Sequence, residues 1–132
     1  MITDPIADLC VRVKNANMAH QSQVKVSGSK LKEALVNIFK QEGFIKDYSV
    51  SSEKGKYKEI EIQLKYGLRH KRVISGVTRI SKPGRRIYAS VGDLKKYTKA
   101  FGVTVLSTQK GILTDKGALR EKVGGEVLLS IW

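Results

Sequence analysis

A short stretch near the middle of the chain, residues 66–72, interrupts every regular pattern of apolar residues around it. Its sequence, Tyr-Gly-Leu-Arg-His-Lys-Arg, has neither a helical nor a strand period, and four of its seven residues are Arg, His or Lys. A chain of 132 residues is long enough for one domain or for two small ones. We therefore predict two domains, formed by residues 1–66 and 67–132.

The first half alternates helical and strand patterns. Asp4 and Pro5 are typical of a helix start, because Asp caps free N–H groups and Pro at the first position loses no helical hydrogen bond. Ser29 predicts the start of a second helix, and Gly43 its end. The core side of that helix is expected to carry Leu31, Ala34, Leu35, Ile38 and Phe39. With strands at residues 24–26, 44–50 and 57–64, the predicted order is α-β-α-β-β.

The second half reads mainly as β-structure. Strands are expected at residues 73–80, 86–90, 103–107 and 126–131, with a turn at 81–84 and short helices at 93–100 and 114–121. The fold class is therefore α+β: an N-terminal α/β domain and a C-terminal, mostly antiparallel β domain with short helices.

Positive charge is concentrated in the second half. The chain has a formal charge of +13; residues 1–65 carry 11 Lys/Arg against 8 Asp/Glu, and residues 66–132 carry 14 against 4. No acidic residue occurs from Ile62 to Gly92, whereas eight cations do: Lys65, Arg69, Lys71, Arg72, Arg79, Lys82, Arg85 and Arg86. Such an excess attracts nucleic acid or an anionic membrane surface. A solvated face that merely improves solubility is the alternative.

The sequence shows no sign of export. No apolar run approaches the roughly 18 residues of a membrane span, and the first residues lack the basic and apolar regions of a signal peptide. The single cysteine, Cys10, lies on the apolar side of the first predicted helix and has no partner for an internal disulfide. We expect a protein of a reducing compartment.

A polar turn follows the strand at 103–107. Ser107, Thr108, Gln109, Lys110 and Gly111 stand between two apolar pairs, which hold the turn at both ends. Such a turn presents hydroxyl groups at defined positions, and the glycine allows a partner to approach closely. The alternative is an ordinary βα loop.

An aromatic residue and the basic stretch give this turn a possible ligand. Tyr88 can stack on a base if it shares a sheet face with the turn. Lys and Arg then bind phosphate, while Ser, Thr and Gln read bases and 2′-hydroxyl groups. The combination predicts recognition of single-stranded or distorted RNA.

Catalysis and metal binding are not supported. His20 and His70 have no Cys or acidic neighbours at metal-ligand spacing, and no glycine-rich phosphate loop is present. Ser107 lacks the nucleophile-elbow pattern, and nothing nominates its base. We predict no enzymatic activity, no metal, no cofactor and no small-molecule substrate. The rival readings are a binder of nucleic acid or anionic membrane that uses charge alone and, more remotely, a hydrolase built on Ser107.

Several segments together resemble one known family. The stretch 102–115, followed by Ala118, resembles the signature of bacterial small-subunit ribosomal protein eight. Further segments agree in the same order: residues 3–8, Arg12 with Asn15 and Ala16, and residues 42–45, 79–84, 86–88 and 124–126.

This resemblance implies two packed α/β domains and a primary binder of the 16S rRNA central domain that helps nucleate its assembly. It implies that Ser107, Thr108 and Gln109 make specific contacts in the minor groove of a distorted RNA helix, with Lys110 and Gly111 against the backbone, Tyr88 alongside, and Glu126 supporting the loop. Where this chain has Gln109 the family usually has Ser; the Gln side chain still donates and accepts.

Their positive charge predicts phosphate contacts for Lys82, Arg85, Arg86, Arg79 and Arg72. The resemblance implies a second RNA contact of the N-terminal domain, from Thr3, Asp4, Pro5 and Asn15. The implied partners are small-subunit proteins five and twelve, and in some members the protein's own operon mRNA. The implied location is the ribosome in the cytoplasm, with an organellar ribosome as the alternative.

Overall fold

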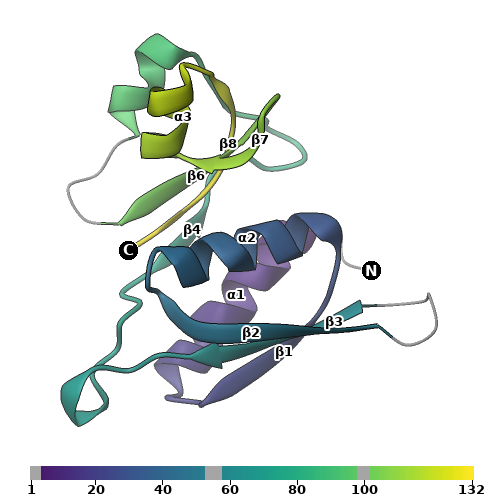
Figure 1. Cartoon of the computed structure of the whole chain (residues 1–132), viewed down its shortest axis with the longest axis vertical. Coiled ribbons are helices and arrows are strands. Elements are labelled where there is room, and N and C mark those ends of the chain that lie inside the picture. The colour runs from purple at the N-terminus through teal and green to yellow at the C-terminus, as the bar shows by residue number, and fades with distance from the viewer. Residues whose placement is uncertain (1–3, 53–57, 98–101) are drawn as a thin grey trace. The chain divides into compact units, whose positions relative to one another are not determined.

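The computed structural model describes residues 4–52, 58–97 and 102–132 (Figure 1). The chain forms two compact units: one comprises Asp8–Ser75, and the other Gly76–Trp132 together with residues 4–7. A boundary between independently folding domains at residues 66 and 67 stays a prediction. Among the described residues no helix is both long and apolar enough to cross a membrane.

The unit of residues 8–75 has the order predicted for the first half. Its elements are α1 (Pro5–Met18, whose first turn belongs to the other unit), β1 (Gln23–Ser27), α2 (Lys30–Gln41), β2 (Ile45–Ser52) and β3 (Lys58–Leu64). The strands form an antiparallel sheet in the order β1-β3-β2, and both helices lie over the same face of it (Figure 1). Ile60, Ile62 and Leu64 of β3 are buried, at alternate positions that place them on that face.

The start of α2 confirms one sequence prediction and corrects another. The side chain of Ser29 accepts a hydrogen bond from the Lys32 backbone N–H at 3.2 Å, as expected of an N-cap. Leu31, however, is 37% exposed, so its place in the core was wrong. Lys32 is buried instead, because its Nζ donates to the Ser27 carbonyl oxygen at 2.9 Å while its aliphatic stem packs inside.

The unit of residues 4–7 and 76–132 is built on a five-stranded antiparallel sheet. Its elements are β4 (Val77–Arg79), β5 (Tyr88–Ala89), the 3₁₀ segment η2 (Val91–Lys96), β6 (Val103–Thr108), β7 (Gly111–Thr114), α3 (Asp115–Glu121) and β8 (Gly125–Ile131). The strand order is β4-β8-β6-β7, and β5 also pairs with β8. Thus β8 is hydrogen-bonded to three other strands.

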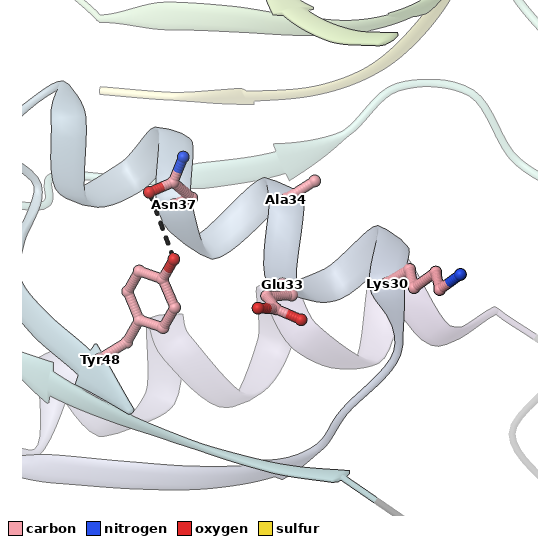
Figure 2. A pocket seen from close by; sticks show the side chains of 5 residues that line it. All are labelled: Lys30, Glu33, Ala34, Asn37 and Tyr48. Atoms are coloured by element: carbon pink, nitrogen blue, oxygen red, sulfur yellow. Dashed lines mark hydrogen bonds between the residues drawn. The ribbon is translucent and has the colours of Figure 1, made fainter. Parts of the chain in front are cut away.

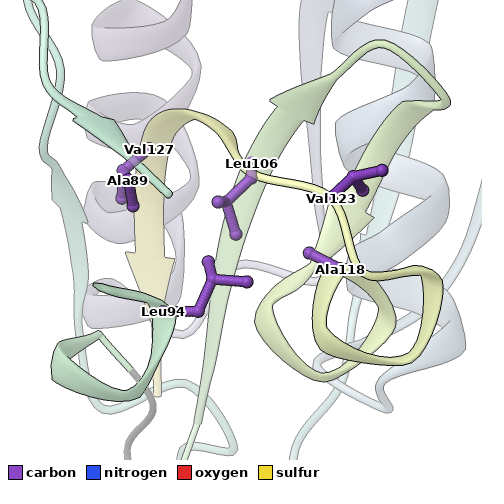
Figure 3. Packing of buried hydrophobic residues seen from close by; sticks show 6 residues of the cluster. All are labelled: Ala89, Leu94, Leu106, Ala118, Val123 and Val127. Carbon is purple, nitrogen blue, oxygen red and sulfur yellow. The ribbon is translucent and has the colours of Figure 1, made fainter. Parts of the chain in front are cut away.

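One face of this sheet carries the unit's hydrophobic core. Leu106 and Val127 project from β6 and β8, Ala89 from β5, and Leu94, Ala118 and Val123 close over them from η2 and the α3 region (Figure 3). The two units together confirm the α+β fold class. Several local predictions differ. The strands expected at 73–80 and 86–90 are shorter, as β4 and β5; η2 is 3₁₀ and ends at Lys96, where a helix over 93–100 was expected; and β7 was not predicted. Residues 98–100 of that expected helix lie outside the described residues.

Candidate nucleic-acid interface

The polar turn is the tip of a β-hairpin between β6 and β7. Thr108 pairs with Gly111, so that Gln109 and Lys110 form the loop. The Thr108 hydroxyl donates to the Gly111 carbonyl oxygen at 2.8 Å and accepts from the Lys110 backbone N–H at 3.1 Å. Gly111 has φ of +106°, a conformation that favours glycine. The side chain of Thr108 was expected to contact RNA; in the structure it also holds the turn together through these two hydrogen bonds.

Ser107 differs from its neighbour. Its side chain is half-buried, and within the part of the chain that the structure describes its hydroxyl makes no hydrogen bond. Nothing there activates the hydroxyl as a nucleophile, because such activation needs a base within hydrogen-bond reach. Both the donor and the acceptor capacity of Ser107 are thus open to a ligand.

The sheet register brings three sequence-distant residues into one row. Ser107 of β6 pairs with Glu126 of β8, which in turn pairs with Tyr88 of β5. Directly paired residues project from the same face of a sheet. That face is opposite to Leu106 and the hydrophobic core, because neighbouring residues alternate between faces. Tyr88 is 68% exposed. We call these three residues the Tyr88–Glu126–Ser107 row.

Glu126 is held by a network at the centre of the row. Its Oε2 accepts from the Ser81 hydroxyl at 2.5 Å and from Arg86 Nη1 at 3.0 Å. Ser81 is fully buried and also accepts from the Ile87 backbone N–H at 3.1 Å. Burial raises the pKa of the Glu126 carboxyl, but the hydrogen bonds from Ser81 and Arg86, with the charges of Arg86 and Arg79, outweigh burial and bring the pKa below its usual value. Glu126 is therefore a fixed carboxylate at neutral pH.

Two glycines let the strands of the row approach closely. A Cβ atom at Gly125 would collide with the Ser107 carbonyl oxygen, and one at Gly124 with the Ala89 carbonyl oxygen. The sequence analysis used this glycine pair as a helix break and as part of a motif, and it gave Ser81 no role beyond the predicted turn and the motif. Ser81 stands in a stretch that reads as a turn, and its partner is 45 residues away in the sequence.

The cations expected to bind phosphate fall into different settings. Lys82 and Arg85 are exposed on a turn closed by two backbone hydrogen bonds between them, and Arg86 is half-exposed beside Glu126. Arg79 is instead only 8% exposed; its guanidinium pairs with Asp4 at 3.2 Å and donates to the Leu128 carbonyl oxygen at 2.7 Å. These contacts favour a structural role for Arg79.

The remaining residues that were predicted to contact RNA are not part of the Tyr88–Glu126–Ser107 row. Arg72 belongs to the other compact unit, and Lys110 pairs with Glu121 at 3.2 Å. Asp4 accepts from the Ala7 backbone N–H at 3.2 Å, as a helix cap does, while Pro5 and Asn15 are exposed. Thr3 lies outside the described residues. Contact of any of these residues with RNA stays a prediction.

A hollow in the unit of residues 8–75 has a mixed lining. Its volume is about 330 Å³, and it lies between α2 and β2. The side chains that line it are shown in Figure 2, where the Tyr48 hydroxyl donates to Asn37 Oδ1; these two atoms are 3.2 Å apart. Its charged lining residues, Lys30 and Glu33, have opposite signs. Within residues 4–52, 58–97 and 102–132, no three His, Cys, Asp or Glu side chains are grouped as a metal site would need.

This antiparallel sheet presents a hydroxyl that is hydrogen-bonded to no base among the described residues, a fixed carboxylate and an aromatic ring, a combination typical of a binding protein. Comparison with known proteins then identifies the family. The chain belongs to the ribosomal protein S8 family, whose model matches residues 4–132. Members of this family are structural ribosomal proteins without enzymatic activity, so the hydrolase reading of Ser107 is wrong.

Similar proteins match over essentially their whole length. The chain is 51% identical to a protein of Lactobacillus delbrueckii subsp. bulgaricus and 49% identical to one of Acholeplasma laidlawii, each over 132 residues that cover 100% of this chain and 99% of the relative. It is 49% identical to a protein of Clostridioides difficile over 131 residues, covering 99% and 98%. All three are described as small ribosomal subunit protein uS8.

Proposed function

We propose that this chain is an rRNA-binding constituent of the small ribosomal subunit, which binds the central domain of 16S rRNA and helps nucleate its assembly. The observation that supports this proposal best is the open hydroxyl of Ser107 beside a fixed carboxylate and an exposed aromatic ring. A strand that presents donors, acceptors and an aromatic face at fixed spacing suits the reading of unpaired bases and 2′-hydroxyl groups.

In this proposal, the residues of the hairpin make different kinds of contact with RNA. Ser107 donates to and accepts from RNA, and the exposed Gln109 side chain reaches further groups. The Thr108 hydroxyl already donates its hydrogen bond to the Gly111 carbonyl oxygen, so it contacts RNA only as an acceptor. Gly111 allows the RNA backbone to approach, since its Cβ position is open space. Tyr88 lies along the edge of a base or ribose.

Lys and Arg side chains and residues near the N-terminus supply the less sequence-specific contacts with RNA. Lys82, Arg85 and Arg86 bind phosphate beside the row, and Lys110 does so at the hairpin tip. A second RNA segment meets the N-terminal region through Thr3, Asp4, Pro5 and Asn15. Within the subunit, which we place in the cytoplasm or in an organelle, proteins five and twelve are the neighbours. Binding of the protein's own operon mRNA belongs to the same proposal.

Replacing Ser107 by Ala tests specific readout. We expect Ser107→Ala to weaken binding to a 16S central-domain fragment by about 1–3 kcal/mol, because an RNA group is left without its partner. The free energy of unfolding should stay unchanged, since the hydroxyl has no partner among the described residues. Binding is measured by filter retention at fixed salt, and unfolding by urea titration.

Ser49→Ala is the matched control, because Ser49 is an exposed strand serine of the other compact unit. It should change neither quantity. If Ser107→Ala binds the fragment as tightly as the unaltered chain, binding depends on charge alone and the specific reading is refuted.

A further inference from the structure

The compact unit of residues 8–75 has a hollow of its own, which the proposed interface does not use. Its volume is about 440 Å³. It is lined by His20, His70, Lys71, Arg72, Ile74 and Ser75. The hollow thus joins the turn after α1 to the basic stretch that follows β3.

Two aromatic rings, those of His20 and His70, line this hollow, and the ring of Tyr66 contacts both of them. The rings of His20 and Tyr66 are stacked, with centroids 5.5 Å apart and planes 20° apart, and the His70 ring lies 6.4 Å from that of Tyr66 at 56°. The Tyr66 hydroxyl donates to the Gln21 carbonyl oxygen at 2.6 Å, which fixes the central ring. His20 and His70 are both exposed, so their outer faces are available for stacking.

The backbone holds the two histidines in an uncommon conformation. His20, Arg69 and His70 have φ values of 54°, 59° and 56°, and the only other non-glycine residue with positive φ in the described chain is Lys122. This conformation is costly for such residues and persists where the surroundings impose it. Here a hydrogen bond of 2.8 Å from the Gly67 N–H to the Lys71 carbonyl oxygen closes the loop. Such strain is commonly found at ligand sites.

Among the described residues, no ion pair compensates the positive charge at the hollow. Lys71 and Arg72 are exposed, and neither forms an ion pair with any described residue. An anion is therefore the complementary ligand. A peptide of acidic residues would satisfy the cations, but its side chains offer no aromatic ring to the exposed imidazole rings, whereas a nucleotide carries both a base and a phosphate.

We propose that this hollow binds one unpaired nucleotide of RNA, with its base against the His20 and His70 rings and its phosphate at Lys71 and Arg72. The site is separate from the Tyr88–Glu126–Ser107 row, since it lies in the other compact unit. It gives the basic stretch a defined ligand where the sequence alone suggested only general attraction.

The test uses the full chain, labelled with ¹⁵N, and titrates it with adenosine 5′-monophosphate or with inorganic phosphate. We expect the nucleotide to shift the amide signals of His20, Tyr66 and residues 70–72. His20→Asn and His70→Asn should each weaken nucleotide binding about fivefold, equivalent to about 1 kcal/mol of stacking, and leave phosphate binding unchanged. Asn is chosen because it tolerates positive φ; the dispersion of the spectrum verifies the fold.

Charge variants and a competitor complete the design. Lys71→Gln with Arg72→Gln should weaken binding of both nucleotide and phosphate, whereas Lys46→Gln, at an exposed position of β2, should change neither. Ser107→Ala should leave nucleotide binding here intact, so this proposal and the proposed function fail independently. Equal affinity for nucleotide and phosphate, shifts spread over all basic residues, or equal competition by a poly-glutamate peptide would overturn it.

Discussion

Three hydroxyl groups near β8 differ in what they already bind, and that difference decides their roles. The Ser81 hydroxyl is buried between Glu126 and the Ile87 N–H, and the Thr108 hydroxyl bridges two backbone groups of its own turn. The Ser107 hydroxyl alone of the three has no partner among the described residues. A hydroxyl that is already hydrogen-bonded within the fold contributes to geometry, whereas one without a partner among the described residues is available to a ligand.

Glu126 should make stability depend on pH in a defined direction. Its pKa in the folded chain lies below the usual 4.5, so its contribution is complete above that value and is lost as pH falls through the lowered pKa. We expect Glu126→Gln to lower the free energy of unfolding by about 1 kcal/mol at pH 7, because Arg86 is half-exposed and screened. Below about pH 4 this difference should shrink. Urea unfolding at neutral pH and again below about pH 4 measures this difference in unfolding free energy.

Glu121→Gln is the matched control for that experiment. Glu121 also pairs with a cation, Lys110, but both side chains are about half-exposed, so the pair adds little stability. A loss for Glu126→Gln that is equal at both pH values, or no larger than that of the control, would contradict the network as described.

Whether the role of a residue could be predicted from the sequence depends on how far along the chain its hydrogen-bonding partner lies. Ser29 and Thr114 were expected at helix starts, and each caps a backbone N–H three residues on. Arg79 was grouped with the free cations, although its partners Asp4 and Leu128 lie 75 and 49 residues away. Local hydrogen bonds leave a pattern in the sequence, whereas a fold-dependent ion pair leaves none.

At the scale of elements, β8 organises the candidate interface. It places Tyr88 and Ser107 on opposite sides of Glu126, which no reading of one strand at a time reveals. The hairpin strand β7 was missed for the same reason: residues 111–114 look like an apolar link to α3 until their pairing with β6 is known. Element types were predictable from periodicity, but pairing and register were not.

Gly125→Ala should test the close approach of β8 to β6. The new methyl group would collide with the Ser107 carbonyl oxygen and lie 3.1 Å from Thr108 Cα, so the end of β6 must move. We expect a loss of about 1–3 kcal/mol in unfolding free energy. RNA affinity should fall as well, even where the variant is fully folded, because Ser107 is displaced. Urea unfolding and RNA filter binding report the two effects.

Gly84→Ala provides the comparison, because nothing lies within 4 Å of a Cβ atom at Gly84. It should leave both quantities within experimental error. Should Gly125→Ala prove as harmless as Gly84→Ala, the packing of β8 against β6 does not control the position of Ser107.

At the scale of the whole molecule, charge and shape have separate tasks. A formal charge of +13 draws the chain to any polyanion, and the exposed Lys82 and Arg85 add to that general attraction. Discrimination needs groups held in place, and the Tyr88–Glu126–Ser107 row is the set that we propose for this task in one compact unit. The hollow beside Tyr66 is the proposed equivalent in the other.

The salt dependence of binding should separate these tasks. Arg85→Ala should weaken binding to cognate and unrelated RNA alike and reduce the slope of log affinity against log salt by about 1. Ser107→Ala should leave that slope unchanged. Lys116→Ala removes an exposed cation from α3, which covers the core face of the sheet, and should not alter the slope. Selective loss of cognate binding in Arg85→Ala would show that this cation reads sequence.

The position of β8 in the chain has a consequence for biosynthesis. All three strands that pair with it, β4, β5 and β6, are translated earlier. While the nascent polypeptide still holds residues 125–131 inside the exit tunnel, β4 and β5 have no neighbour to dock on, and Glu126 has not met Ser81. Since long-range strand pairing is slow and exposes unpaired edges, we expect the proposed RNA-binding surface to form only after β8 has left the tunnel.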